Sequence, residues 1–505
     1  MAMDQKDSAA ENGKGDNLRW WVLLTVIIGT FLGRLDQTIV SLATPSIIQD
    51  FSITVSEAAW ISTAYILANA IFVPVWGKLG DTSGRKKVYI LGFVGFIIGS
   101  MLAGLAWDLN SMILFRVIQA IAGSADYPTA MAIIAVTFKA GKERAQALGL
   151  WSTSFAAASV FGPLLGGPLI DLFGWRSVFL INIPIGIIGL AMAMFFVKES
   201  VSDKRTVKFD WPGAITLGIA LSSLVLVLDK GLDWGWLSGV SIMMYIIVAL
   251  FGLIFIRIET RHDEPIIDLG FFRNPAFVGA IVNNFIVFMG LIGGIFLVPV
   301  FAQTFLGYDA TSTGLIFIPM TFSLFIAAQI GSRLDNIDAG RVIAISTLIA
   351  AIGMFSFVFF IDARSTALDV ILPLSLMAFG IGLAMSQRTN IIASTVPENE
   401  IGSASSALAL VRNISGAFGI ALFATILQDS TESHVLALAR ESVVNSAGQL
   451  AYAQASTLII LKAQVLAYHD VFIASAAILF IGAILAFFIK PGTAAKPNTG
   501  VFAEA

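Results

Sequence analysis

The chain has 505 residues, of which 57% are hydrophobic and only 12% are charged, with a formal net charge of −3. A soluble domain carries about 25% charged residues, so this composition excludes an ordinary soluble fold and predicts a protein whose surface faces lipid. The chain has no cysteine and only three histidines, which excludes thiolate metal sites and argues against a metal or other cofactor. The slightly acidic balance argues against nucleic acid as a partner.

The predicted elements are membrane-spanning helices, each needing about 20 mostly apolar residues. Residues 1–19 precede them as a polar tail without the pattern of a cleavable signal. Fourteen apolar segments follow: 20–44, 57–77, 88–106, 111–137, 145–169, 176–197, 211–229, 238–257, 275–300, 312–332, 341–361, 369–390, 401–427 and 470–490. The sequence therefore predicts an all-α membrane protein with fourteen transmembrane helices.

Lysine and arginine are concentrated in alternate connecting segments, which indicates the cytoplasmic side. Segments around Lys86, Lys142, Lys204 and Arg261 are basic, whereas the opposite segments hold few cations. We therefore expect a multi-pass protein of the inner (plasma) membrane with both termini, including the tail 491–505, in the cytoplasm.

An internal repeat divides the chain. Gly77 and Asp81 have the same spacing as Gly331 and Asp335. A Gly-Arg pair then opens the next helix in both places, at Gly84-Arg85 and Gly340-Arg341. Repeated halves are typical of secondary transporters, with the substrate site between them. We expect six-helix bundles at 20–200 and 271–490, and two inserted helices within 201–270.

The segment 428–469 mixes leucine and valine with polar residues. We expect an external loop containing an amphipathic helix. It caps the bundle, rests on the membrane surface or contacts a partner, and a periplasmic adaptor protein is a candidate partner.

Ionisable residues inside a span are functional candidates because they are costly there. At 1.5 Å per residue, Asp36 lies about 24 Å along a helix rising from the inside and Arg116 about 8 Å along one descending from the outside. Both reach the same level, so we expect them to meet. Making and breaking this contact would couple a proton to conformational change; the alternative is a permanent structural ion pair.

Asp126, lower in the same helix as Arg116, is a second candidate proton site, an attractor for a cationic substrate, or a partner for another polar helix face. Arg388 is expected near the inner edge, with its side chain reaching toward the surface. Polar candidates for the substrate pathway are Gln119, Tyr127, Asn283, Asn284, Arg412 and Asn413.

Two small-residue motifs complete the candidates. Gly162 and Gly166 permit close helix packing, while Pro163 with Gly167 weakens the helix so that it bends, either to seal a pathway or only to pack. The cytoplasmic motif Gly77, Asp81, Gly84 and Arg85 is a candidate gate, with Asp81 capping a helix or pairing with Arg85.

Six motifs occur in order along the chain: Leu35-Asp36-Gln-Thr-Ile-Val40, Gly77 to Lys87, Arg116-Val-Ile-Gln119 to Gly123, Ser159 to Gly167, Trp175 to Pro184 and Phe209 to Gly213. Taken together, they resemble those of the major facilitator superfamily, and more narrowly the fourteen-helix drug:proton antiporters of the EmrB/QacA type. The sequence departs from that pattern at Arg34, Ser41, Ala120 and Asp126.

The resemblance implies a major facilitator fold and a proton-coupled antiporter that exports small lipophilic or cationic compounds, with the Gly162-Pro163 motif favouring antiport. The alternative on the same fold is a symporter or a physiological exporter of a peptide, siderophore or lipid. No Walker A motif is present, which excludes ATP-driven transport by this chain alone. An intramembrane enzyme is disfavoured because no nucleophile–base constellation is found.

Overall fold

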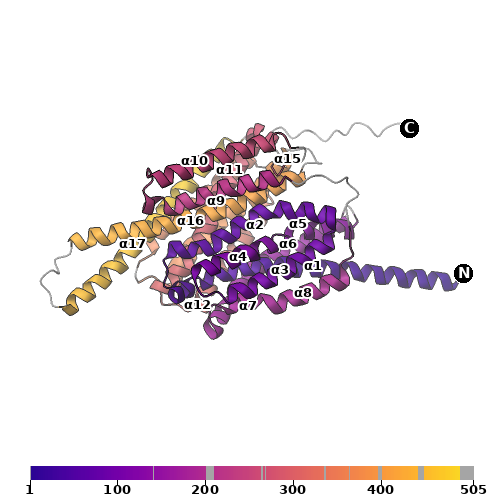
Figure 1. Ribbon diagram of the computed structural model, residues 1–505, viewed down its shortest axis with the longest axis horizontal. Helices are drawn as coiled ribbons and strands as arrows, with labels where there is room; N and C mark the ends of the chain where they lie inside the picture. The colour runs from indigo at the N-terminus through magenta and orange to yellow at the C-terminus, as the bar shows by residue number, and fades with distance from the viewer. Residues whose placement is uncertain are drawn as a thin grey trace. The chain divides into compact units, whose positions relative to one another are not determined.

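The structure is a computed structural model that describes residues 2–139, 142–200, 210–262, 265–267, 269–334, 337–362, 364–395, 401–441 and 449–489. All regular secondary structure in these ranges is helical (Figure 1). Two compact units are formed, one by residues 1–218 with 299–318 and the other by 219–298 with 319–505. We call them unit 1 and unit 2.

Unit 1 is built mainly from the first half of the sequence. Its helices are α1 (Ala2–Phe51), α2 (Val55–Ser83), α3 (Arg85–Gly104), α4 (Leu109–Gly123), α5 (Asp126–Thr137), α6 (Lys142–Phe173), α7 (Ser177–Leu180) and α8 (Asn182–Phe196). The first part of α9 (Trp211–Trp234) also belongs to it.

Unit 2 contains most of the second half. Its helices are α10 (Gly239–Glu259), a short 3-10 turn (Leu269–Arg273), α11 (Pro275–Phe305), α12 (Ala310–Gly331), α13 (Ala339–Phe360), α14 (Ala367–Leu383), α15 (Met385–Ser394), α16 (Ile401–Glu441) and α17 (Gln449–Phe487). The end of α11 and the start of α12 are assigned to unit 1.

Local capping explains several helix starts. Thr54 and Glu57 form a capping box at α2, and Asp108 and Ser111 form one at α4, each satisfying backbone N–H groups that the helix cannot. Hydrogen bonds from Ser111 hold the pKa of the exposed Asp108 carboxyl below its ordinary value.

The predicted fold class is confirmed. Twelve helices in the described part of the chain are long and apolar enough to cross a membrane. The other two predicted spans fall on α6, whose apolar part is Ala157–Phe173, and on α4 with α5. This predicted span is divided into α4 and α5 by a break at residues 124–125, because Pro128 has no N–H to donate to the carbonyl of Ser124.

The segment 428–469, expected as an external loop containing an amphipathic helix, is helical wherever the structure describes it, which leaves out residues 442–448. α16 continues to Glu441 and α17 already begins at Gln449, and Figure 1 shows both extensions projecting at the left of the view. Abundant alanine and leucine favour helix here despite the polar residues. His434 and Asp470 pair at 2.8 Å where the extensions begin.

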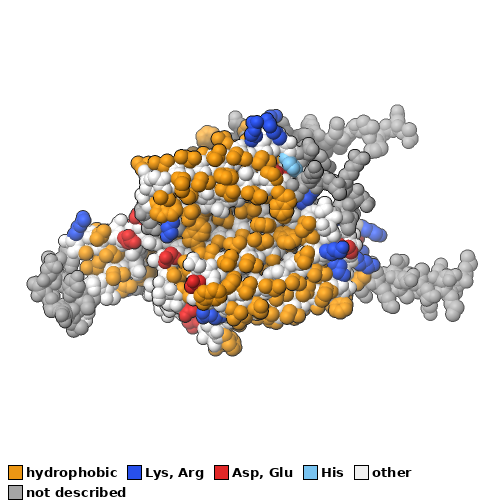
Figure 2. Space-filling view, in the orientation of Figure 1, with side chains coloured by type: hydrophobic (Ala, Val, Ile, Leu, Met, Phe, Trp, Pro, Cys, Tyr) orange, Lys and Arg blue, Asp and Glu red, His pale blue; other side chains and the backbone are white. Residues whose placement is uncertain are grey.

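The core of unit 1 is apolar and lies between α1, α3, α5, α6 and α8, with Leu32, Phe93, Ile134 and Trp151 among its buried residues. The outer surface is also apolar, as Figure 2 shows on the visible face. Phe195 is 81% exposed and Leu253 66% exposed. Exposed side chains of this kind along helices are expected of a surface that faces lipid.

Candidate functional site

The predicted contact between Asp36 and Arg116 is present at the centre of unit 1. Arg116 Nη1 lies 2.6 Å from Asp36 Oδ2, and the two side chains are 1% and 0% exposed. Gln119 is one turn after Arg116 on α4, so both point to the same side. Its Nε2 donates to Asp36 Oδ1 at 2.9 Å, and its Oε1 accepts from Arg116 at 2.6 Å.

Two further residues join this cluster. Asn182, the first residue of α8, donates to Asp36 Oδ1 at 2.8 Å, and Ser100 on α3 accepts from Gln119 at 2.7 Å and from Asn182 at 3.3 Å. Three helices, α1, α4 and α8, therefore meet at one carboxylate, and α3 joins the cluster through Ser100. Sequence reasoning missed Asn182, although it had noted the segment Trp175 to Pro184 that contains it.

Aromatic rings close the cluster. The Arg116 guanidinium lies 4.0 Å from the centre of the Tyr65 ring and 5.6 Å from that of Phe179. These cation–π contacts stabilise a buried cation. Removing one partner of a buried ion pair is strongly destabilising, so this pair is an important contact between α1 and α4.

Asp126 lies in a different place. It begins α5 directly after the helix break, and Thr30 on α1 donates to its Oδ2 at 2.7 Å. Trp151 in turn donates to Thr30 at 2.9 Å, and the Tyr127 ring packs 5.3 Å from that of Trp151. The structure does not bring Asp126 to Arg116, which pairs with Asp36 instead.

A small cavity adjoins Asp126. It has a volume of about 20 Å³ and is lined by Gly29, Gly33, Tyr89 and Phe93 among others. A site of this size has room for about one water molecule. Asp126 is therefore a second acid, half-buried and separate from the Asp36 cluster, with Thr30 as a polar neighbour and space beside it.

The motif with Gly77, Asp81, Gly84 and Arg85 joins α2 to α3. Gly77 and Gly80 allow α2 to approach Pro128 and Thr129 on α5. Gly84 has φ +111°, a conformation that favours glycine, and a Cβ there would lie 2.6 Å from the Glu199 carboxylate. The side chain of Asp81 lies outside the described part of the structure.

Glu199 accepts hydrogen bonds from backbone N–H groups in the first turn of α3. Its two carboxylate oxygens accept from the backbone N–H groups of Lys86 and Lys87 at 3.1 and 3.2 Å, and the N–H of Arg85 donates to the Ser200 carbonyl at 3.0 Å. An acid is stabilising at a helix N-terminus. Glu199 was not predicted, because only tertiary structure brings the end of the α8 segment to α3.

The glycine motif of α6 makes two close contacts within unit 1. A side chain at Gly162 would collide with Thr38, and one at Gly166 would press on Ile39. On another side, Gly167 faces Thr311, and Gly314 faces the Pro163 carbonyl. The motif therefore packs α6 against both α1 and the start of α12.

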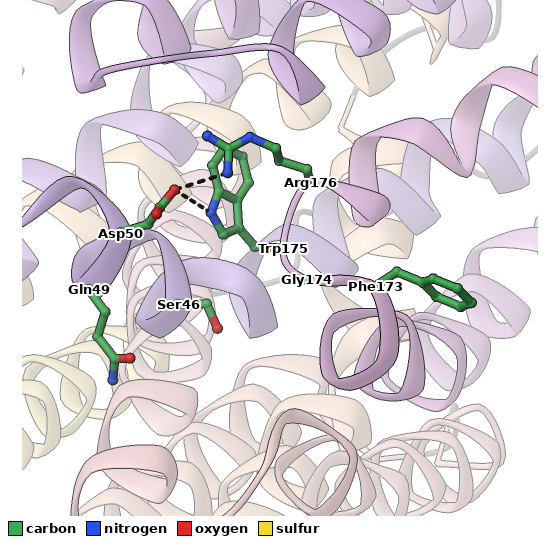
Figure 3. Close-up of a pocket in the computed structure, with 7 residues that line it drawn as sticks. All are labelled: Ser46, Gln49, Asp50, Phe173, Gly174, Trp175 and Arg176. Carbon is green, nitrogen blue, oxygen red and sulfur yellow. Dashed lines mark hydrogen bonds and ion pairs between the residues drawn. The ribbon is translucent and has the colours of Figure 1, made fainter.

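Asp171 reinforces the contact with α12. Its carboxylate accepts from the N–H groups of Ala310 and Thr311 at 3.0 and 2.9 Å, and from the Thr311 hydroxyl. Nearby, Asp50 accepts from Trp175 Nε1 and Arg176 Nη1, each at 3.0 Å, and fixes the end of α1 to the turn after α6. Figure 3 shows this pair in a surface pocket that does not contain Asp36.

The remaining polar candidates lie in unit 2. Arg388 was expected to reach toward the surface, but its side chain is buried, with 1% exposed. Its Nε donates to Asn283 at 2.8 Å, its Nη1 to the Ile381 carbonyl and its Nη2 to Thr347. The neutral oxygen atoms of these three residues stabilise the buried Arg388 guanidinium. Arg412 on α16 donates to Asn284 at 3.3 Å. Asn413 is half-buried.

Comparison with known proteins places this arrangement in a family. Residues 26–420 match the model of the Major Facilitator Superfamily. The structure is similar to that of a bacterial homolog of the human lysosomal transporter Spinster, with a TM-score of 0.65, 17% identity, and coverage of 94% of this chain and 99% of that one.

Several proteins similar to this chain are named as transporters or resistance proteins. Multidrug transporter protein MdtP of Bacillus subtilis is 32% identical over 82% of this chain and 76% of its own length. The probable multidrug resistance protein EmrY of Escherichia coli is 31% identical over 81% and 80%. Riboflavin transporter RibZ of Clostridioides difficile is 29% identical over 82% and 89%. The chain therefore belongs to the major facilitator superfamily, in its drug-efflux branch, and is a multi-pass membrane transporter.

Proposed function

We propose that the protein is a proton-coupled antiporter of the inner (plasma) membrane. It would export small amphipathic or cationic compounds by alternating access, with both termini in the cytoplasm. The observation that carries the proposal is the buried cluster in which Arg116, Gln119 and Asn182 donate to the one carboxylate of Asp36.

In the proposed cycle, Asp36 is charged in the arrangement in which it pairs with Arg116. A proton taken up by Asp36 removes the negative charge that Arg116 requires. Leaving a guanidinium buried without its counter-charge costs about 3–5 kcal/mol, which is large enough to drive a change between two packed arrangements of α1 and α4. Loss of the proton on the other side restores the contact.

Asp126 is the second proton site in this proposal or an attractor for a cationic substrate. Its hydrogen bond from Thr30 and the adjoining cavity support either role. Gln119 positions Asp36 rather than lining a pathway, since both of its polar ends are engaged within the cluster.

Two motifs would act as gates. The segment with Gly77, Asp81, Gly84 and Arg85 would control the cytoplasmic side, supported by the contact of Glu199 with the start of α3. The glycine motif with Pro163 would seal the opposite side, supported by its close packing on the start of α12.

The names of MdtP and EmrY support drug export, while that of RibZ keeps a physiological metabolite as the second candidate substrate. An adaptor protein would meet the α16–α17 extensions, where Leu436 and Leu458 are exposed.

The test uses inside-out vesicles containing the protein, a lipophilic fluorescent cation such as ethidium, and an imposed proton gradient. Uptake should require the gradient and stop when a protonophore collapses it, and substrate addition should release protons from the acidified interior. Uptake that persists after collapse of the gradient would contradict the proposal.

A further inference from the structure

The surface pocket of Figure 3 has no role in the proposed transport cycle. It has a volume of about 410 Å³ and is lined by Ser46, Gln49, Asp50, Phe173, Gly174, Trp175 and Arg176. Pockets that bind small molecules measure about 300–1,000 Å³, so this one has room for a small organic group. All of its lining residues belong to unit 1, and the proposed topology puts this end of α1 on the outer side of the membrane.

The charges around the pocket favour a cation. Asp50 is the second-last residue of α1, and the last turn of this helix has no basic residue. The carbonyl end of a helix carries a partial negative charge, so a carboxylate there adds to the negative potential. Arg176 compensates for it only in part, because both side chains of the Asp50–Arg176 pair are 45% exposed, and exposed ion pairs contribute only about 0–1 kcal/mol.

One oxygen of the Asp50 carboxylate is available to a ligand. Trp175 Nε1 and Arg176 Nη1 both donate to the other oxygen, Oδ2, as the two dashed lines in Figure 3 show. Among the described residues none donates to Oδ1. The Arg176 guanidinium is also held by the Ala106 carbonyl at 3.2 Å and lies 4.2 Å from the centre of a Trp175 ring. Both residues therefore hold Oδ2 in place and leave Oδ1 as an acceptor.

Two neutral acceptors and an apolar edge complete the pocket. Ser46 lies one turn before Asp50 on α1, and Gln49 is next to Asp50. Neither side chain makes a hydrogen bond within the described part of the chain, and each offers an oxygen that accepts one. Phe173 and its neighbour Leu172 are 72% and 74% exposed, so apolar surface for a hydrocarbon group lies beside the polar groups.

These features fit an organic ammonium ion better than other ligands. Ca²⁺ takes about six to eight oxygen ligands, usually from several carboxylates, whereas the pocket has one carboxylate. An anion would be repelled by Asp50 and by the carbonyl end of α1. A primary ammonium group has three N–H donors, and the pocket offers the Asp50, Ser46 and Gln49 oxygens as acceptors.

We propose that this pocket binds the primary ammonium group of an amphiphile. Asp50 supplies the charge, Ser46 and Gln49 accept hydrogen bonds, and Phe173 contacts the apolar part, while Arg176 positions the carboxylate. Two sources carry such a group: a free amphipathic amine, including an exported one, and the headgroup of phosphatidylethanolamine. The inference goes beyond the proposed function, because binding at this pocket requires neither proton coupling nor transport.

The experiment places a single thiol in the pocket. Ser46→Cys does this, since the chain has no cysteine of its own. The full chain is put into phosphatidylcholine nanodiscs, which contain no primary amine, and the rate of modification by the neutral reagent methyl methanethiosulfonate is measured. Dansylcadaverine, which carries a primary ammonium, should slow the reaction severalfold, whereas N-acetyldansylcadaverine, with the same ring and chain but no charge, should not. In a second arm phosphatidylethanolamine replaces part of the lipid and no amine is added. Protection in that arm supports the lipid as the source, and protection by dansylcadaverine alone supports a free amine.

Asp50→Asn in the Ser46→Cys chain should weaken the protection about tenfold, because a charge-assisted hydrogen bond contributes about that factor. Asp429→Asn is the matched control, since Asp429 is an exposed acid on α16 outside the pocket. If Ser46→Cys does not assemble or does not react, Gln49→Cys replaces it, because Gln49 is exposed.

Three results would overturn the inference: no protection by either source, equal protection by the acetylated compound, or protection that Asp50→Asn leaves unchanged. Because no gradient is imposed and no transport is measured, any of them would leave the proposed export function standing.

Discussion

Asn182 offers the sharpest test of how the Asp36 carboxylate is held. Asn182→Ala removes one of the two amide donors to Oδ1 and leaves Gln119 and the Arg116 contact in place. The side chain is 0% exposed, so water does not simply replace it. The charged carboxylate should lose stabilisation, while the protonated acid loses less.

A hydrogen bond to a charged group contributes about 1.5–3 kcal/mol. Since about 1.4 kcal/mol corresponds to a factor of ten in an equilibrium, protonation of the cluster should become about ten- to a hundredfold more favourable. Because the anion is less stabilised, proton uptake occurs at a lower proton concentration. The pH at which proton-driven transport is half-maximal should therefore move about one to two units toward alkaline values.

The assay is uptake of a fluorescent substrate into inside-out vesicles, measured across pH at a constant gradient. Asn110→Ala is the matched control, because this asparagine is exposed in the first turn of α4. A profile for Asn182→Ala identical to that of the wild type, in protein that assembles normally, would refute the role of Asn182 in holding Asp36.

Three further predictions concern the ends of the helices. Asp171→Asn should raise passive leak of preloaded substrate from proteoliposomes severalfold, because it removes the charge that accepts from Ala310 and Thr311; unchanged leak would mean that this contact does not seal. Glu199→Gln should lower turnover and reduce the free energy of unfolding by about 0.3–1 kcal/mol, because it removes the negative charge at the start of α3. Turnover at the wild-type rate would mean that Glu199 is not part of the gate. A single cysteine at Ser446 should react with an impermeant thiol reagent in intact cells and one at Ser83 should not, and the reverse pattern would contradict the orientation.

The spans were predictable because a run of about 20 apolar residues has few alternatives to a membrane helix. The meeting of Asp36 and Arg116 was predictable for a related reason. Buried charges are rare within spans, and these two were at one level. The break before Asp126 was missed, although Pro128 contains the signal for it.

Other features depend on tertiary structure. Asn182 is 146 residues from Asp36 in the sequence, and a lone asparagine at a helix start has many ordinary uses. Glu199 and Asp171 are acids at helix ends, where sequence alone does not say which distant N–H groups they accept from. The continuation of α16 to Glu441 and the start of α17 at Gln449 were hidden because mixed polar and apolar residues also suit a loop.

Asp36→Asn tests the central claim most directly, because asparagine keeps the shape of a permanently protonated acid. The measurement compares two activities of the same proteoliposomes: uptake driven by a proton gradient, and exchange of labelled for unlabelled substrate without one. We predict that gradient-driven accumulation is abolished while exchange is retained. Accumulation at the wild-type level by Asp36→Asn would contradict the account and would move the coupling site elsewhere, with Asp126 the next to be substituted.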